Sequence, residues 1–426
     1  LIGGKIDTPK DKAFDLENDM GIKSLHKFLQ RHTPSVYVYK PIADYRGFRV
    51  AVDMNLYLYV HKSRSKKNWF KSFFHMLLLL RQNELKLVAI YDTQAPPEKY
   101  AKQQQRKDRR SSNELRVREL TQDLENYQQR GTVTDLLKSV MEKNASRYNL
   151  LSNSSDYIDE QIILSEINQI QGQIIHVTKH DVVLSRQMLE SLSIPIFDAP
   201  TEAETFCAHL CYHNYVDAVL SNDTDVLVYR TKHFLTKLDT TNMTVIDLQF
   251  DDLIQRLGLT AEQFIDFCIM CETDYNPNMK RIGPEKAYKL IKQYGSLEAI
   301  RDNTKHDTSV LNFERVREIF SIPETLDVTI DFQDIDEEKM NNFQNYYNTN
   351  NTLKPMLNFK DVVSAFEGET HTKFDEHKSD PIKDIKHNNK DGNDQEERSP
   401  ILRPESEDDP VSGNVWHKVG SRKGDS

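Results

Sequence analysis

One segment, from Asp198 to Tyr229, constrains the fold of this chain more than any other. It contains a predicted helix over 203–213, followed by a short buried strand over 217–220. Four acids flank these two elements, in two pairs with a spacing of two residues: Glu202, Glu204, Asp223 and Asp225. Open α/β sheets place their functional groups where a strand ends and a helix begins. The segment therefore predicts an α/β fold with four carboxylates at one edge of a sheet.

The two acid pairs also have structural interpretations. Acids in the first turn of a helix suit the helix dipole, and Asp-x-Asp often fills a turn. If the backbone after the strand is extended, the spacing of Asp223 and Asp225 points both carboxylates to the same side. Two pairs that meet across one β-α-β unit favour a functional site over two separate structural roles.

Further acids follow other predicted strands. A buried strand over 49–58 carries Asp53, and a second strand over 86–91 is followed by Asp92. An apolar helix is predicted over 69–82, between these strands. Apolar strands that each deliver an acid indicate a mostly parallel sheet flanked by helices. Seven acids in all lie at predicted element ends: Asp53, Asp92, Glu202, Glu204, Asp223, Asp225 and Asp274.

Seven clustered carboxylates need cations to offset their charge. Ligand sets made only of oxygen suit hard divalent ions, so the sequence favours Mg²⁺ or Mn²⁺ over zinc. Two such ions can activate a water and stabilise the leaving oxygen of a phosphodiester. A basic helix predicted over 98–118 could hold the phosphate. The polar stretch over 113–173 is typical of a lid, a binding loop or disorder.

Composition limits the class of protein. The net charge of −10 argues against a protein that coats DNA, although a local basic surface remains compatible with nucleic acid. No apolar run is long enough for a membrane span and no signal peptide is visible, so we expect an intracellular protein without membrane association. The cysteines lie in apolar helical runs, which favours packed thiols over a zinc site. We interpret His75 and His209 in the same way, as packing or surface residues.

The motifs, in their order along residues 20–366, resemble the XPG-type 5′ nuclease superfamily, and most closely the flap endonucleases. The motifs that carry this resemblance are MGIKSL (20–25), VAVDMNLYLY (50–59), IYDTQAPPEK (90–99), DAPTEAET (198–205), SNDTDVLVY (221–229), and CETDY with RIGPEKA (271–287). The resemblance implies a PIN-like nuclease core with a helical arch and a helix–two-turn–helix that grips duplex DNA, often with bound K⁺.

By this resemblance all seven acids hold two Mg²⁺ ions directly or through water, with Mn²⁺ able to substitute. Lys99 and Arg106 match the basic pair that stabilises the scissile phosphate. We also expect four residues to contact DNA: Gly21, Lys102, Gly283 and Lys286. The implied function is hydrolysis of flapped or branched DNA by a monomer in replication or repair, in a nucleus or at a viral replication site.

The chain departs from the family at several positions. Thr93, Glu272 and Arg281 stand where the family usually has glycine. The arch is longer than in typical flap endonucleases, and a sliding-clamp motif is not visible. We expect five regions: a leader over 1–19, an N-terminal nuclease region over 20–110, an extended arch over 111–176, an internal nuclease region over 177–366, and a disordered tail over 367–426.

Some alternatives stay open at this point. A tight glycine turn near Gly283 can present backbone N–H groups to a phosphate, but an ordinary helical hairpin fits equally well. The leader would obstruct the position of Gly21, so we expect either a misassigned start or a processed segment, with the true start at Met20. A basic cluster between helices either contacts DNA or is solvated: Lys62, Arg64, Lys66 and Lys67. The alternative functions are a non-catalytic DNA-junction scaffold, or a nuclease that prefers Holliday junctions, nicked or gapped DNA, or RNA.

Overall fold

The computed structural model describes residues 21–145 and 158–350, all of which belong to one compact unit, Leu1–Glu369. The expected leader over 1–19, the start at Met20, the last part of the predicted folded region (351–366) and the expected tail over 367–426 lie outside the described residues. The five-region division therefore stays a prediction.

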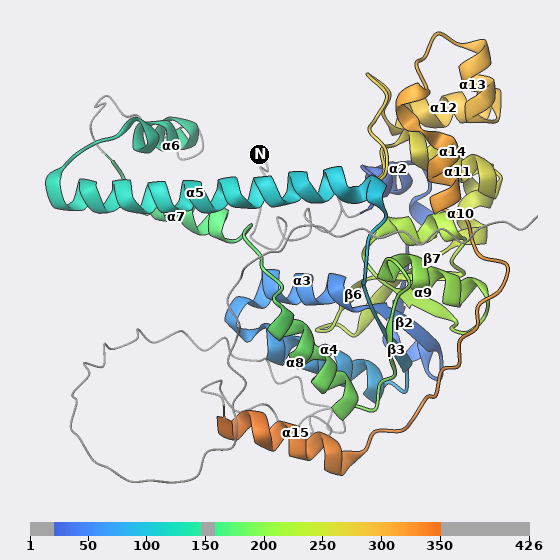
Figure 1. Cartoon of the computed structure of the whole chain (residues 1–426), viewed down its shortest axis with the longest axis horizontal. Helices are drawn as coiled ribbons and strands as arrows, with labels where there is room; N and C mark the ends of the chain where they lie inside the picture. Colours follow the sequence, from blue (N-terminus) through green and yellow to red (C-terminus); the bar gives the residue numbers. More distant parts are fainter. Residues whose placement is uncertain (1–20, 146–157, 351–426) are drawn as a thin grey trace, which may run out of the picture. The chain divides into compact units, whose positions relative to one another are not determined.

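A seven-stranded sheet forms the centre of the unit, with strand order β1-β7-β6-β5-β2-β3-β4 (Figure 1). The strands are β1 Val38–Pro41, β2 Arg49–Asp53, β3 Lys86–Tyr91, β4 Ile196–Asp198, β5 Ala218–Leu220, β6 His233–Asp239 and β7 Thr244–Gln249. Neighbouring strands are parallel throughout the five-strand row β6-β5-β2-β3-β4. Strand β7 is antiparallel to both of its neighbours, β1 and β6. The predicted mostly parallel sheet is confirmed.

Helices cover both faces of this sheet. In β2, Ala51 faces one hydrophobic core while Val50 and Val52 face the other, as the two-residue period of a strand requires. The first core packs against α2 Leu25–His32, α9 Ala203–Tyr212, α10 Phe250–Leu257, α11 Ala261–Met270, α12 Pro284–Tyr294, α13 Leu297–Asn303 and α14 Phe313–Ile319. The second packs against α3 Met54–Ser65, α4 Trp69–Gln82, α8 Lys179–Ser191 and α15 Glu337–Asn350. Burial on both faces explains why the central strands are almost wholly apolar.

Two predictions of extended backbone at the acids are wrong. The strand predicted over 49–58 ends at Asp53, and α3 begins at the next residue. The Asp53 carboxylate accepts a hydrogen bond from the backbone N–H of Leu56 at 3.0 Å, so an N-cap starts the helix there. Asp225 lies in a 3₁₀ helix, η5 Thr224–Tyr229, and not in an extended segment. In both places a short apolar run fits strand and helix equally well, and the capping aspartate decides.

A helical insertion, α5–α7, lies between β3 and β4. It comprises α5 Tyr100–Arg130, α6 Asp135–Ala145 and α7 Glu160–Gln171. The basic helix predicted over 98–118 continues to Arg130 and ends at Gly131, whose φ of +66° suits glycine. Figure 1 shows α7 running alongside α5, and the insertion buries a small core of its own that includes Leu120, Leu137 and Ile163. The described part of the polar stretch is therefore packed helix.

The remaining elements are short. Single 3₁₀ turns occur at η1 Pro34–Val36, η2 Ile42–Tyr45, η3 Lys66–Asn68, η4 Pro97–Lys99 and η6 Ser309–Leu311. All four cysteines are free and buried, as the sequence predicts. Among the helices of the described residues, none combines the length and the apolar character needed to cross a membrane.

Candidate active site

The seven predicted acids come from five places in the fold that meet at the carboxyl edge of the parallel strands. Asp53 ends β2 and Asp92 follows β3. Glu202 and Glu204 open α9, Asp223 and Asp225 open η5, and Asp274 follows α11. Their charges act on one another, so the seven form one electrostatic group. We call this group the acid cluster.

Backbone N–H groups at helix starts hold several of these carboxylates. Asp92 accepts hydrogen bonds from the Ala203 N–H and from Asn55 Nδ2, both at 2.7 Å. Asp223 accepts from the N–H of Asp225 at 2.8 Å. Each acid thereby caps a helix as well as pointing toward the cluster, and this fixes its position.

Lys99 lies among the carboxylates and is buried, with 8% of its surface exposed. Its ammonium group donates to Glu202, and it lies 3.3 Å from Glu204 Oε1 and 3.5 Å from Asp274 Oδ2. Burial alone would lower the pKa of Lys99, but Glu204, Glu202 and Asp274 raise it above its ordinary value. Lys99 is therefore charged and offsets part of the negative charge of the cluster.

Two further side chains complete the surroundings of Lys99. Arg106, on the exposed side of α5, donates through one nitrogen to both oxygens of Asp274, at 2.8 and 3.0 Å. The Tyr275 hydroxyl donates to Glu202 Oε2 at 2.6 Å, and its ring lies 5.8 Å from Lys99 Nζ. Sequence reasoning missed Tyr275 as a site residue, although its place directly after Asp274 was a usable signal.

The carboxylates remain short of positive charge. Burial, together with Asp92 and Glu204, raises the pKa of Asp53 well above its usual range. Burial and Glu204 raise the pKa of Asp223 to about 7. Burial and Asp223 also raise the pKa of Asp225, whose buried Oδ1 has no hydrogen-bond partner. Crowded acids of this kind are typical of functional sites.

The donor set fits divalent metal ions. Its ligand atoms are all carboxylate oxygens, which suit Mg²⁺ or Mn²⁺, and the unpartnered Asp225 Oδ1 is available to a cation. In the arrangement described for residues 21–145 and 158–350, no three His, Cys, Asp or Glu side chains form a group that could hold an ion. Lys99 and Arg106 bind three of the seven carboxylates, those of Glu202, Glu204 and Asp274.

Gly21, one of the residues predicted to contact DNA, lies against the acid cluster. Its φ is +77°, and a Cβ on it would lie 2.2 Å from Asp223 Oδ1. The N–H of the next residue, Ile22, donates to Thr224 Oγ1 at 2.9 Å. Only glycine allows this close approach, so the segment over 21–25 supports the Asp223 turn directly.

The three positions where glycine is usual in the family differ in what they demand of the backbone. Glu272 and Arg281 both have left-handed backbones, with φ of +76° and +64°. Thr93 does not have a positive φ, and its hydroxyl donates to the Ala199 carbonyl at 2.7 Å. Glycine is therefore favoured on conformational grounds at two of the three positions.

The remaining predicted DNA-binding residues lie outside the acid cluster. Lys102 lies in the first turn of α5 and donates to Glu272 at 2.6 Å. Gly283 caps α12 with an ordinary negative φ, and Lys286 is exposed in the first turn of that helix. A Cβ on Gly283 would meet nothing within 4 Å, so its conformation does not require glycine.

Two residues whose roles were considered from the sequence, Lys62 and His209, contact other side chains within the fold. Lys62, from the basic cluster of open role, binds Asp181 at the start of α8 and lies over the Trp69 ring. The His209 ring packs edge-on against Tyr229, and burial lowers its pKa to about 4. The second observation agrees with the interpretation of His209 as a packing residue, whereas the ion pair of Lys62 belongs to neither of the two alternatives for the basic cluster.

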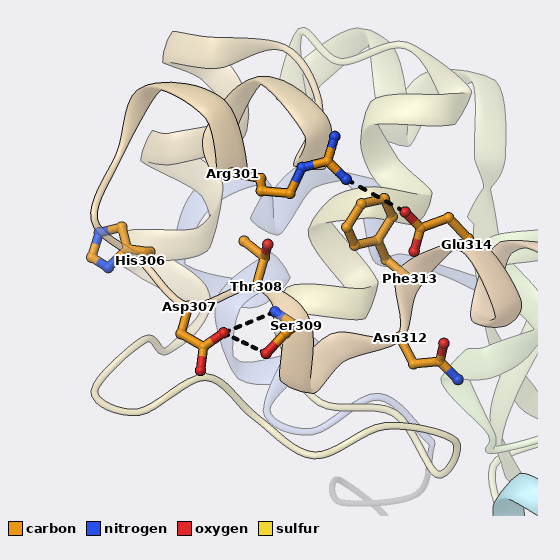
Figure 2. Close-up of a pocket in the computed structure, with 8 residues that line it drawn as sticks. All are labelled: Arg301, His306, Asp307, Thr308, Ser309, Asn312, Phe313 and Glu314. Atoms are coloured by element: carbon orange, nitrogen blue, oxygen red, sulfur yellow. Dashed lines mark hydrogen bonds and ion pairs between the residues drawn. The ribbon is translucent and has the colours of Figure 1, made fainter.

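A polar pocket of about 340 Å³ lies elsewhere in the fold (Figure 2). Figure 2 shows Arg301 directed toward Glu314, and Asp307 bonded to Ser309, on the segment that joins α13 to α14. No member of the acid cluster lines this pocket. This pocket is therefore separate from the acid cluster.

Comparison with known proteins finds two matching family profiles along the chain. The XPG N-terminal domain profile matches residues 20–113, and the XPG I-region profile matches 193–274. All residues of the acid cluster, with Lys99 and Arg106, fall within these two regions.

Two relatives and one solved structure illustrate the similarity. A probable RAD2-like endonuclease of Invertebrate iridescent virus 3 is 32% identical over 337 residues, covering 72% of this chain and 87% of the relative. Flap endonuclease 1-B of Oryza sativa subsp. indica is 26% identical over 376 residues, covering 82% of this chain and 81% of its own length. The catalytic core of Rad2 in complex with a DNA substrate has a similar fold, with a TM-score of 0.51 at 16% identity, covering 80% of this chain and 98% of that structure.

Proposed function

Because this chain belongs to the XPG family of nucleases, we propose that it hydrolyses DNA phosphodiesters at 5′ flaps or branched junctions with the help of divalent metal ions. The observation that carries this proposal is the acid cluster itself. Seven carboxylates from five segments surround a buried lysine at the edge of the sheet, and one buried carboxylate oxygen has no partner. A cluster with this excess of negative charge is costly unless it serves cations.

The residues divide into two roles. The acid cluster would hold Mg²⁺, or Mn²⁺ in its place, and the ions would supply an activated water and neutralise the leaving oxygen. Lys99 and Arg106 would bind the scissile phosphate, because both can exchange a carboxylate for a phosphate oxygen. They are part of η4 and α5, the base of the helical insertion, so this segment would position the phosphate over the carboxylates.

The described surroundings support DNA as the substrate. The many basic residues of α5 and the exposed Lys286 on α12 offer cations to a DNA backbone. The Rad2 core of similar fold was solved with a DNA substrate. We propose a monomer with K⁺ at the helix–two-turn–helix, and the relative from an iridescent virus favours a viral site of DNA replication over a nucleus.

A labelled 5′-flap duplex tests the proposal, beside nicked, gapped, Holliday-junction and single-stranded RNA substrates, each with Mg²⁺ or EDTA. We expect incision at the flap base that requires Mg²⁺ and is lost in Asp223→Ala. The matched control is Asp217→Asn, since Asp217 lies just before β5 and Asp223 just after it. Asp217→Asn should still cleave.

The other outcomes are equally informative. Preference for Holliday junctions, nicks, gaps or RNA would keep the chemistry and change the substrate. Tight binding of flapped DNA without cleavage in any metal would overturn the catalytic proposal and favour a junction-binding scaffold.

A further inference from the structure

Glu272 has an unusual environment for a surface glutamate. It lies in the turn after α11 with a φ of +76°, and its side chain is only 13% exposed. Two ammonium groups bind its carboxylate, Lys23 Nζ at 2.7 Å from Oε2 and Lys102 Nζ at 2.6 Å from Oε1. The Lys23 backbone N–H also donates to the Glu272 carbonyl at 3.1 Å.

The two lysines come from different parts of the chain and meet only at this carboxylate. Lys23 lies just before α2, and Lys102 lies in the first turn of α5, next to the segment that carries Lys99. Their side chains are 62% and 30% exposed, more than that of Glu272 between them. The group carries one net positive charge, and the lysines remain open to the surface.

Two ammonium groups on the two oxygens of one anion also form a suitable arrangement for the non-bridging oxygens of a phosphodiester. Glu272 is two residues before Asp274 of the acid cluster, so this position adjoins the proposed site of cleavage. A carboxylate there occupies the place that a backbone phosphate could take.

We propose that Lys23 and Lys102 form a binding subsite for a DNA backbone phosphate, and that the Glu272 carboxylate fills this subsite until substrate displaces it. This inference rests on the proposed function, since it assumes a DNA substrate at the acid cluster. Glu272 then competes with DNA, so it weakens binding and makes it less sensitive to salt. A purely structural tie between α2, α5 and α11 would instead contribute only to stability.

The test measures binding of flapped DNA in EDTA, where no cleavage occurs, across a range of salt concentrations. Glu272→Gln removes the charge and keeps the side-chain size. We expect it to bind about three- to tenfold more tightly at low salt, with a slope of log K against log salt that is steeper by about one. The gain should vanish when Lys23→Ala and Lys102→Ala are added, because the freed cations are then absent.

Two further variants separate charge from backbone effects. Glu272→Gly removes both the carboxylate and the left-handed strain. Tighter DNA binding in both the Gln and the Gly variants would come from the lost charge. Tighter binding in the Gly variant alone would overturn the proposal. Glu84→Gln is the matched control. Glu84 also has a positive φ, +61°, and lies 3.5 Å from Arg46, but it precedes β3 at the opposite edge of the sheet. It should bind like the unchanged protein.

The outcomes also separate this inference from the proposed function. If the unchanged protein cleaves flaps with Mg²⁺ and Glu272→Gln alters neither affinity nor salt slope, the subsite is overturned and the nuclease stands. A gain that persists without Lys23 and Lys102 also overturns the subsite. If the unchanged protein binds DNA and Glu272→Gln binds it more tightly, but nothing is cleaved in any metal, the subsite stands and the catalytic proposal fails.

Discussion

One buried carboxylate on β7 and the carboxylates of the acid cluster belong to the same sheet and differ in how their charge is offset. On β7, Asp247 is fully buried, and Lys40 Nζ and His233 Nδ1 lie 2.8 and 3.0 Å from its Oδ2. Burial would raise its pKa, but the hydrogen bonds with His233 and Lys40 hold it below its usual range. In the acid cluster, burial and neighbouring carboxylates raise the pKa of Asp225, and its Oδ1 has no partner.

The two sites therefore differ in whether the fold itself supplies the partners of the acids. Asp247 has its partners within the fold, so it contributes to the stability of the β1-β7-β6 edge. The acid cluster has too few cations for its carboxylates, so its ionised form destabilises the free protein. An external cation would remove that penalty, which links folding stability to ligand binding at one of the two sites only.

The largest expected effect is on catalysis. Asp225→Asn should lower the rate of Mg²⁺-dependent flap cleavage by about a thousandfold or more, because it removes an oxygen ligand from the acid cluster. Asp247→Asn should leave the rate per folded molecule within about a few fold. Single-turnover cleavage below the melting transition measures both, and equal losses in the two variants would remove the contrast between the sites.

The second effect concerns Lys99. Lys99→Met should lower the free energy of unfolding by about 4 kcal/mol in EDTA at neutral pH, because it leaves buried carboxylates without their cation. Mg²⁺ should restore more stability to this variant than to the unchanged protein. Chemical denaturation with and without Mg²⁺ measures this difference, and equal stabilisation of both proteins would argue against ions and Lys99 sharing one site.

Asp247→Asn should cost about 3 kcal/mol of stability, since it removes the charge of a buried carboxylate that both Lys40 and His233 contact. In contrast to Lys99→Met, this loss should be the same with and without Mg²⁺. Denaturation of both variants in parallel tests the distinction. A Mg²⁺-dependent rescue of Asp247→Asn would show that the two acid sites are coupled.

The smallest effect is a dependence of stability on pH. Folded Asp223 keeps its proton up to about pH 7, whereas the unfolded residue loses it near pH 4. Between these values the folded state binds more protons, so stability in EDTA should fall as pH rises. The pKa of Asp247 is lowered, so its effect on stability has the opposite dependence on pH. Its stabilising contribution is present above about pH 4 and is lost as pH falls.

Between about pH 5 and about pH 8 the melting temperature in EDTA combines the fall caused by the acid cluster with an opposite rise from buried histidines such as His209, so the change in slope between variants reports the acid cluster. Asp223→Asn should make this slope more positive, and saturating Mg²⁺ should act in the same direction. A slope that neither change alters would place its origin outside the acid cluster.

Much of the fold could be predicted because its signals are local. The helix over 69–82 and the strand over 86–91 have clear periods and flanking breaks, and both have the predicted bounds. The strand over 49–58 was predicted too long, because Asp53 ends it by capping a helix within an apolar run. That choice depends on packing which the run itself does not encode.

The site was predicted as a set of residues and not as an arrangement. The acids at element ends were found because parallel strands place them at one edge. The contacts of Lys99 with Glu202, 103 residues away in sequence, and of Lys23 with Glu272, 249 residues away, have no local signal. For the left-handed backbones at Glu272 and Arg281, the signal in the sequence was that the family usually has glycine at these positions.

The place of the helical insertion has a consequence for how such proteins can diverge. It follows β3 through η4 and leads through α8 into β4, and these two strands are neighbours held in register by pairs such as Ile90 with Phe197. The sheet fixes these exits whatever lies between them, and the insertion brings its own small core. Its length and sequence can therefore change over generations without moving Asp92 or Glu202. New substrate preferences could arise by exchange of this one part while the chemistry is inherited intact.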